Sequence, residues 1–301
     1  MKILIVGTGA IGGFYAGMLF KAGSEISILA KSDFEKIKKD GIAIESIWGD
    51  FKFMPKNIYR NISECKEKFD FIIIATKVLP EISLQSLIGQ VVDEKTSIVL
   101  IQNGIFIEDD VVKIFPNNHL LSVIAFIASE RVASGLIKHS DSGKLTFGEY
   151  HLPDLNKTKS LIALFEKSNV PCFLVEDIQF ERWKKLVWNA AFNPISVVAG
   201  GLDSKEILDN PYLEKLVKNV MMEVVLLAKL QNYEISKEFV EKTISDTKNR
   251  KIPSRTSMLI DFEAGNKMEF EAILGNALRF AKLKMVEVPY IETLYALISN
   301  Y

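Results

Sequence analysis

The chain of 301 residues is too long for one small core, so we expect two domains. Apolar residues make up 48% of it and charged residues 25%, a composition typical of soluble globular proteins. The 37 basic and 38 acidic residues leave a net charge of -1, which argues against a nucleic-acid partner or an anionic membrane surface. No apolar run reaches the length of about 18 residues that a membrane span needs. Cys65 and Cys172 have no metal-binding spacing, so we expect no metal site and a reducing, cytoplasmic environment.

The N-terminus combines a short apolar strand with a glycine-rich turn. After the strand Lys2–Val6 comes a GxGxxG sequence that opens a helical stretch and consists of Gly7, Thr8, Gly9, Ala10, Ile11 and Gly12. Gly7 permits the tight turn, Gly9 lets a pyrophosphate approach the backbone, and Gly12 lets the helix pack on the strand. The phosphates would then bind free N–H groups at the helix N-terminus. This context predicts a nucleotide-binding site made by these six residues, against the alternative of an incidental glycine-rich turn.

The end of the second predicted strand bears on the choice of coenzyme. This strand, Glu25–Ala30, is followed by Lys31 and Ser32, where an NAD-binding protein would place an acid on the ribose 2′-hydroxyl. A cation and a hydroxyl suit a 2′-phosphate, so NADP is favoured over NAD. Asp33 lies close by and weakens this argument, and Lys31 could also be an ordinary surface lysine.

Further strands alternate with helical stretches, which indicates an α/β fold. The predicted strands and hairpins are Ile42–Phe53 with a turn at Gly49-Asp50, Phe71–Ala75, Ser97–Ile101, Leu120–Ile127, Leu136–Ser140, Lys144–Gly148 with a hairpin turn at Ser142-Gly143, and Cys172–Val175. Leu155–Ser168 is predicted to be a helix. Ligands of doubly wound sheets bind beyond the carboxyl ends of the strands, where Lys77 and Asn103 are expected. Asn103 could also be a simple turn residue before Gly104.

No strand pattern follows Val175, and the rest of the chain predicts helices. After the helix that contains Glu181 these are Tyr212–Gln231, Ser236–Lys248, most of Asp261–Lys282, and Ile291–Ser299. The predicted fold class is therefore an α/β N-terminal Rossmann-type domain, residues 1–176, followed by an all-α C-terminal domain, residues 177–301. The helical half could support a homodimer, although the sequence shows no specific patch.

One helix of the second half carries a polar seam. Lys185, Asn189 and Asn193 recur every four residues and therefore lie along one face, each about 40° past the last. The residues between them are nearly all apolar, so the helix is expected to be buried. Unpaired buried polar groups cost about 1–3 kcal/mol each, so the protein or a ligand must supply partners. The alternative is a solvated seam at a helix edge.

Two more polar features stand out among the helices. Ser257 lies in the sequence SRTSML, which opens a helix, so hydroxyls and free N–H groups there could hold an anion such as a carboxylate. Glu269 lies among apolar residues in KMEFEAILGNAL and could pair with a lysine.

Taken together and in this order, these stretches resemble the ketopantoate reductases (2-dehydropantoate 2-reductases). The likeness spans nearly the whole chain and rests on KILIVGTGAIGG, IATK, IQNG, WKKLVWNAAFNP, TSMLID, the surroundings of Glu269, and VPYIETLY. It implies a Rossmann domain and a helical domain like the C-terminal domain of 6-phosphogluconate dehydrogenase, with the active site between them. It also implies NADPH-dependent reduction of 2-dehydropantoate to (R)-pantoate, a step towards pantothenate and coenzyme A.

The resemblance implies roles for the seam and its surroundings. Lys185 falls on the family's catalytic lysine, which hydrogen-bonds the 2-keto oxygen and donates a proton to it. Glu269 matches the catalytic acid that orients this lysine and contacts the nicotinamide ribose. Asn189 and Asn193 match substrate-binding asparagines, and Ser257 matches the serine that holds the substrate carboxylate. Such a donor fits the chemistry, because hydride addition to a ketone builds negative charge on its oxygen.

On the coenzyme side, the resemblance places Lys77 and Asn103 at the rim of the cofactor and active site. Asn103 would also contact substrate. Lys31 lies where the family usually has an arginine that grips the 2′-phosphate. The replacement loses a bidentate fork, so the NADP preference could be weaker.

Three further departures bear on the substrate. Asp203, expected among the substrate-binding residues, stands where many members have an asparagine and could disfavour a carboxylate. Leu274 replaces a frequent asparagine, and Phe106 follows NGI where a glycine is common. We therefore also consider a paralogue that reduces another small 2-keto acid, and a non-catalytic NADP-sensing protein.

Overall fold

The computed structural model describes residues 1–301, which form two compact units. The first contains residues 1–102 and 108–178, and the second contains residues 103–107 and 179–301. The helical unit thus begins two residues after the predicted boundary, at Gln179. The short loop at 103–107, which follows a strand of the first unit, packs with the second unit. No helix is both long and apolar enough to cross a membrane.

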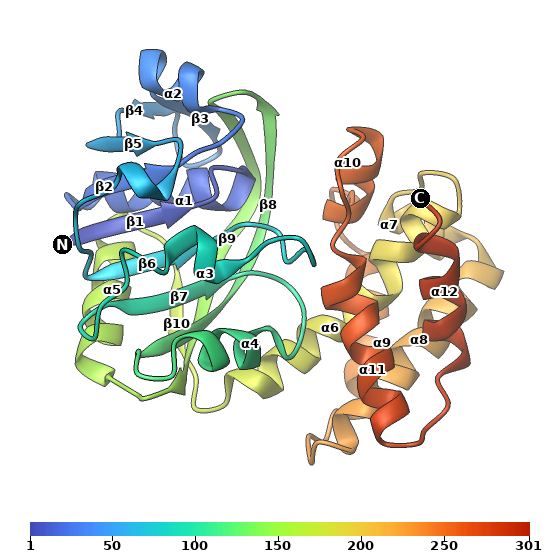
Figure 1. Ribbon diagram of the computed structural model, residues 1–301. Coiled ribbons are helices and arrows are strands. Elements are labelled where there is room, and N and C mark those ends of the chain that lie inside the picture. The colour runs from blue at the N-terminus through green and yellow to red at the C-terminus, as the bar shows by residue number, and fades with distance from the viewer. The chain divides into compact units, whose positions relative to one another are not determined.

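The first unit is built on one ten-stranded mixed sheet (Figure 1). Its strands are β1 (Lys2–Val6), β2 (Glu25–Leu29), β3 (Ile42–Ser46), β4 (Phe51–Phe53), β5 (Asn57–Tyr59), β6 (Phe71–Ile74), β7 (Ser97–Ile101), β8 (Leu120–Ala133), β9 (Leu136–His151) and β10 (Cys172–Leu174). They lie in the order β4-β3-β9-β8-β7-β6-β1-β2-β5, and β10 pairs with β9. β1 runs parallel to both β2 and β6, so the order reverses beside β1. This is the Rossmann-type arrangement, in which ligands bind where the strand order reverses.

Helices of the first unit pack against this sheet. They are α1 (Ala10–Lys21), α2 (Phe34–Asp40), the 3₁₀ turn η1 (Ile62–Glu64), α3 (Leu84–Ile88), α4 (Ile107–Ile114) and α5 (Leu155–Lys167). α1 and α5 share a core with the sheet, in which Phe14, Tyr15 and Phe165 pack on Ile3 and Ile5. The burial along β1 fits a strand that is covered on both faces, since Leu4 and Val6 are buried as well.

The predicted hairpin turn at Ser142-Gly143 is wrong. β8 and β9 form one long hairpin whose turn lies at Ser134-Gly135, and Figure 1 shows both strands curving along the unit. Ser142 and Gly143 have positive φ angles of 61° and 112° inside β9, where the pairing with β8 is irregular. Gly143 makes room for Trp48, whose ring would collide with a Cβ atom there. Glycine marks bulges as well as turns, and its sequence signal does not separate the two.

The second unit is helical. It contains α6 (Ile178–Val198), α7 (Ser204–Asp209), α8 (Pro211–Lys229), α9 (Lys237–Lys248), α10 (Ser257–Glu263), the π-helical turn η2 (Glu271–Gly275), α11 (Asn276–Leu283) and α12 (Pro289–Ile298). The stretch predicted as mostly helical from Asp261 to Lys282 is interrupted, because α10 ends at Glu263 and Glu269 lies on the non-helical segment before η2. α6 provides much of the core through Trp183, Leu186 and Val187.

A buried carboxylate joins two helices of this unit. Glu223 of α8 is 8% exposed and accepts hydrogen bonds from the backbone N–H groups of Tyr290 (2.9 Å) and Ile291 (2.8 Å). These groups belong to the first turn of α12, which has no side-chain cap of its own. Burial raises the pKa of Glu223, and the two hydrogen bonds oppose that effect. The carboxylate therefore replaces a cap for α12.

We expect Glu223→Ala to lower the free energy of unfolding by about 2–4 kcal/mol, because it leaves two buried N–H groups unsatisfied and a cavity. Thermal denaturation, with hydrogen exchange of residues 289–298, measures the effect. Glu223→Gln keeps an acceptor oxygen and should cost less. Equal losses in the two variants, or unchanged exchange in α12, would contradict this account.

Candidate active site

The glycine-rich turn of the first unit has the geometry of a phosphate-binding site. Gly7 has φ 96°, and a Cβ atom there would lie 2.9 Å from the backbone nitrogen of Thr76. A Cβ atom at Gly12 would collide with the carbonyl oxygen of Gly7, whereas one at Gly9 would meet nothing within 4 Å. Gly9 is also the N-cap of α1 and offers no side chain to its first N–H groups. These residues fit the pyrophosphate of a dinucleotide coenzyme, with open space beside Gly9 and uncapped N–H groups next to it.

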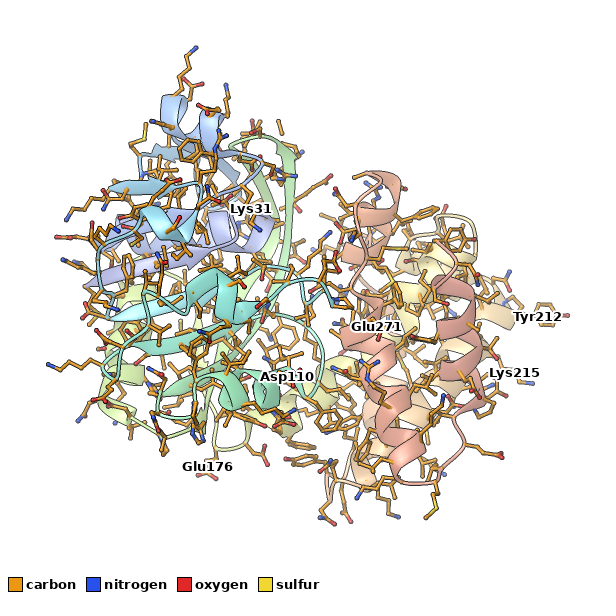
Figure 2. All side chains as sticks on the ribbon, viewed as in Figure 1. Lys31, Asp110, Glu176, Tyr212, Lys215 and Glu271 are labelled. Atoms are coloured by element: carbon orange, nitrogen blue, oxygen red, sulfur yellow. The ribbon has the colours of Figure 1, made fainter.

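A polar cluster follows β2 in the same unit. Asp33 is only 3% exposed, and its carboxylate accepts hydrogen bonds from Arg131 Nη1 (2.7 Å), Ser134 (3.0 Å) and Ser32 (3.4 Å). Lys31, labelled in Figure 2, is exposed. The acid that weakened the sequence argument for NADP is thus engaged by a guanidinium within the protein. Sequence reasoning missed Arg131, because it lies about a hundred residues away at the far end of β8.

Lys77 and Asn103 fall in different units. Lys77 is partly buried in the loop after β6, where the side chain of Gln102 donates to the carbonyl oxygen of Thr76 (2.7 Å). Asn103 lies two residues after the end of β7 and packs with the helical unit. Each follows the carboxyl end of its strand, where the sequence predicts it.

The predicted polar seam lies on α6. Asn189 is 7% exposed and Asn193 is 1% exposed, and the side-chain nitrogen of Asn193 has no hydrogen-bond partner in the protein. Of the intervening residues, Trp188 is partly buried against the core and the other five, Leu186, Val187, Ala190, Ala191 and Phe192, lie within it. The eight helical steps from Lys185 to Asn193 cover about 12 Å along the helix axis, enough for a small organic acid.

The loop at 103–107 brings Asn103 to Lys185. The Lys185 ammonium donates to Asn103 Oδ1 at 2.8 Å. Ile105 is fully buried in the helical core, and its carbonyl oxygen accepts from the side-chain nitrogen of Asn276 at 2.7 Å. Gly104, with φ 102°, lies so close to η2 that a Cβ atom would be 2.5 Å from the carbonyl oxygen of Ala272. The acceptor for Lys185 is therefore held by packing of the whole loop.

The surroundings of Lys185 change its acidity. Desolvation by burial lowers its pKa to about 7, and the nearby positive charge of Arg182 acts in the same direction, while Glu269 acts in the opposite direction. The Lys185 side chain keeps some contact with solvent. An amine with a pKa near neutrality can both hold and release a proton at ordinary pH, which suits a general acid.

Ser257 lies next to the far end of the seam. It is exposed and is the first residue of α10, whose N-cap is Thr256. The Thr256 hydroxyl accepts from the N–H of Leu259 (3.0 Å) and shares a hydrogen bond with Ser196 of α6 (2.7 Å). α10 has only seven residues and its side-chain cap is in place. The hydroxyl of Ser257 is thus a better candidate for an anion contact than the helix terminus.

The three departures noted in the sequence have structural explanations. Asp203 is the N-cap of α7, where its carboxylate accepts from the N–H groups of Lys205 and Glu206 in a capping box. Leu274 is fully buried in η2. Phe106 has φ 60° and packs against Trp183 and Phe280. Because capping accounts for Asp203, we leave it out of the proposed site.

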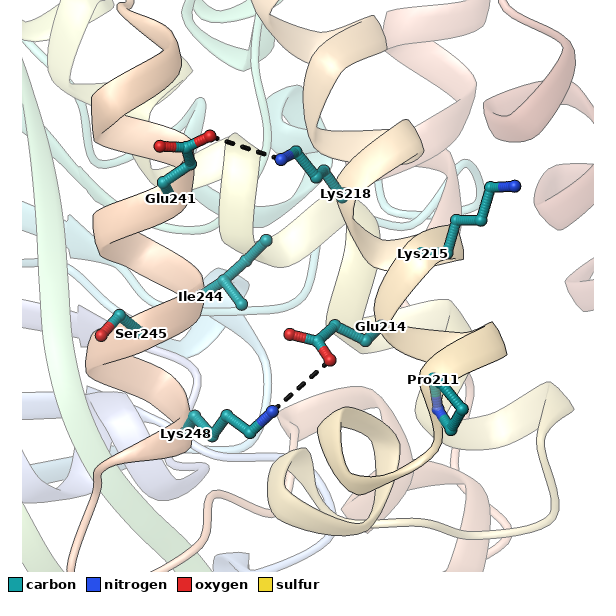
Figure 3. A pocket seen from close by; sticks show the side chains of 8 residues that line it. All are labelled: Pro211, Glu214, Lys215, Lys218, Glu241, Ile244, Ser245 and Lys248. Atoms are coloured by element: carbon teal, nitrogen blue, oxygen red, sulfur yellow. Dashed lines mark hydrogen bonds and ion pairs between the residues drawn. The ribbon is translucent and has the colours of Figure 1, made fainter.

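An open groove on the helical unit lies outside the candidate active site. It has a volume of about 520 Å³ and is lined by Pro211, Glu214, Lys215, Lys218, Glu241, Ile244, Ser245 and Lys248 (Figure 3). Four of its five charged side chains form two ion pairs, Lys218 with Glu241 and Lys248 with Glu214, each at 3.4 Å. None of the predicted site residues lines it, so we assign it no role in the chemistry.

Comparisons with known proteins match both units. The family model described as ketopantoate reductase PanE/ApbA matches residues 3–151, and the one described as ketopantoate reductase PanE/ApbA C terminal matches residues 177–301. A 2-dehydropantoate 2-reductase from Nostoc sp. is 35% identical over 299 residues, 98% of this chain and 93% of that protein. The crystal structure of 2-dehydropantoate 2-reductase from Methylococcus capsulatus has a TM-score of 0.91 at 40% identity and covers 99% of this chain and 96% of that one. D-Mandelate dehydrogenase, solved with NADH and anilino(oxo)acetate, shares the fold, with a TM-score of 0.92 at 20% identity and coverage of 100% and 98%.

We expect Gly104→Ala to destabilise the helical unit, because the new methyl group must push the loop away from Ala272 while the residue keeps a positive φ. Gly200→Ala is the matched control, since Gly200 has φ 96° and a Cβ atom added there would meet no other atom within 4 Å. Both variants should suffer the backbone strain of about 1–2 kcal/mol, and Gly104→Ala should lose more in thermal denaturation. Equal losses would show that the close approach to η2 contributes nothing.

Proposed function

Because the chain belongs to the ketopantoate reductase family, a family of pyridine-nucleotide-dependent oxidoreductases, we propose that it reduces 2-dehydropantoate to (R)-pantoate with NADPH. The observation that carries this proposal is Lys185, a largely buried amine with a pKa of about 7 on a polar seam beside Asn103. A protein that only sensed the coenzyme would have no use for such a proton donor. The product would serve pantothenate and coenzyme A synthesis.

Lys185 would be the proton donor of the reaction. When bound, the nicotinamide supplies a hydride to the keto carbon of the substrate. The Lys185 ammonium would hydrogen-bond the keto oxygen, stabilise the negative charge that develops on it, and transfer one proton to it. The neutral amine would regain its proton from water. Asn103 and Glu269 would keep the amine aimed at the oxygen.

The rest of the seam would bind the substrate. The unpaired side-chain nitrogen of Asn193 needs an acceptor, which a hydroxyl or keto oxygen could supply. Asn189 would make a similar contact one turn earlier on α6, and Ser257 would hold the carboxylate.

The coenzyme would bind to the first unit. The turn from Gly7 to Gly12 would hold the pyrophosphate, and Lys77 would line the coenzyme site. The ribose 2′-phosphate would lie at the end of β2 with Lys31 and Arg131. All hydrogen bonds of Arg131 within the protein run through Nη1, which leaves its other N–H groups for an anion. A homodimer stays a prediction.

The activity is tested by mixing the purified protein with NADPH and 2-dehydropantoate and following the absorbance of the coenzyme. We expect oxidation of NADPH that depends on the substrate. Turnover of another small 2-keto acid instead would identify a paralogue with a different substrate. NADPH binding without turnover of any keto acid would favour a sensor.

Lys185→Ala should lower kcat by at least about a hundredfold, because general acid catalysis typically contributes 10²–10⁴-fold. Binding of NADPH, measured by protein fluorescence, should persist. In the unaltered protein the rate of reduction should fall as the pH rises through the pKa of Lys185, since the donor must be protonated. Near-normal turnover in the variant would remove Lys185 from this role.

Arg131→Gln combined with Asp33→Asn should weaken NADPH binding by about tenfold, because one charge-assisted contact to the 2′-phosphate is lost. The double variant avoids leaving the Asp33 carboxylate buried without its partner. Calorimetric titration of the coenzyme-free protein with NADPH and with NADH measures the effect, and NADH affinity should hardly change. Equal weakening of both coenzymes would contradict a 2′-phosphate contact.

A further inference from the structure

Arg182 is a buried cation that neither the motif resemblance nor the seam pattern explains. It lies on α6, three residues before Lys185, and is only 3% exposed. Its Nη1 donates to the carbonyl oxygen of Gly104 at 3.0 Å. Residues three apart on a helix are neighbours on its surface, so two cationic side chains lie side by side here.

Such an arrangement carries a free-energy cost. Burying a guanidinium requires hydrogen bonds that replace water, and placing it beside a second cation adds repulsion. The charged groups that act on Lys185 are Arg182 from α6 and Glu269 from the segment before η2, and Asn103 from the loop is its neutral hydrogen-bond partner. Glu269 and Asn103 would be enough to hold Lys185 in place. The buried charge of Arg182 must therefore have a function other than fixing the lysine.

We propose that Arg182 is a positioning residue for the reaction, which fixes the loop that carries Asn103 and keeps a second positive charge beside the Lys185 ammonium. The proposal rests on the proposed role of Lys185. Through Gly104 the guanidinium holds the residue next to Asn103, so it sets the place of the amide that accepts from Lys185. Arg182 itself touches neither substrate nor coenzyme in this account.

The charge has a chemical consequence. A neighbouring cation favours the neutral amine. Arg182 therefore lowers the pKa of Lys185 further than burial alone does. A more acidic ammonium gives its proton to the forming alkoxide more readily.

The experiment measures the titration of Lys185 without substrate. Acetic anhydride labels neutral amines, and mass spectrometry of the labelled peptides at a series of pH values gives the midpoint for Lys185, with exposed Lys215 as internal reference. Arg182→Gln removes the charge but can still donate to Gly104. Arg182→Lys keeps the charge and loses the planar fork. Lys184→Gln is the matched control, because it removes a positive charge from the same helical turn, where Lys184 pairs with Glu181 at 2.7 Å.

We expect Arg182→Gln to raise the midpoint of Lys185 by at least about one pH unit, and Arg182→Lys and Lys184→Gln to leave it near the original value. The basic limb of the pH profile of kcat should move by the same amount in Arg182→Gln. An unchanged midpoint in a folded Arg182→Gln protein, or an equal shift in Lys184→Gln, would overturn the proposal. If Arg182→Gln does not fold, Arg182→Met, which removes the charge and fills similar space, takes its place. The labelling needs no turnover, so it tests the role of Arg182 even if the protein does not reduce 2-dehydropantoate.

Discussion

The burial of one amine in a mostly apolar helix is the constraint on which the helical unit depends. Desolvation disfavours the ammonium form of Lys185, so the protein must supply a partner that keeps the side chain in one place without fully restoring its charge. Asn103 does this as a neutral acceptor, and Glu269 adds a weaker opposing influence. A neutral acceptor of this kind holds the amine in place without the strong stabilisation of the ammonium form that an opposite charge supplies.

That partner comes from a loop that is part of the helical core. Ile105 is buried there, Asn276 and Arg182 bind the carbonyl oxygens of the loop, and Phe106 packs between aromatic rings in spite of its positive φ. Backbone strain of about 1–3 kcal/mol persists only where packing over-determines the conformation. The loop begins at Asn103, two residues after the end of β7 in the sequence, and belongs to the helical unit.

At the end of β2 in the first unit, a buried charge is likewise balanced by a partner within the protein. Asp33 would repel a 2′-phosphate if its carboxylate were exposed, but it is buried and engaged by Arg131 and two hydroxyl groups. The long β8–β9 hairpin brings that arginine to the end of β2. In sequence the region offers only Lys31 as a cation. In the folded unit it offers a lysine and a guanidinium, the two groups that we propose for the ribose 2′-phosphate.

Much of this protein could be predicted from local sequence, because strands and helix faces follow short-range periodicity. β1 and β7 have the predicted bounds, β3 and β4 form the predicted hairpin, and the four-residue spacing placed Lys185, Asn189 and Asn193 on one face of α6. The sequence could not show which glycine turns a hairpin and which makes a bulge, since both need a positive φ. Nor could it show that Arg131 meets Asp33 or that Arg182 holds Gly104, because these contacts join residues 78 to 98 positions apart. The sequence by itself determined which segments fold and which side chains share a face. Only the tertiary structure decided which charges meet, because burial and distance set the free energy of a charge and neither is a local property of the chain.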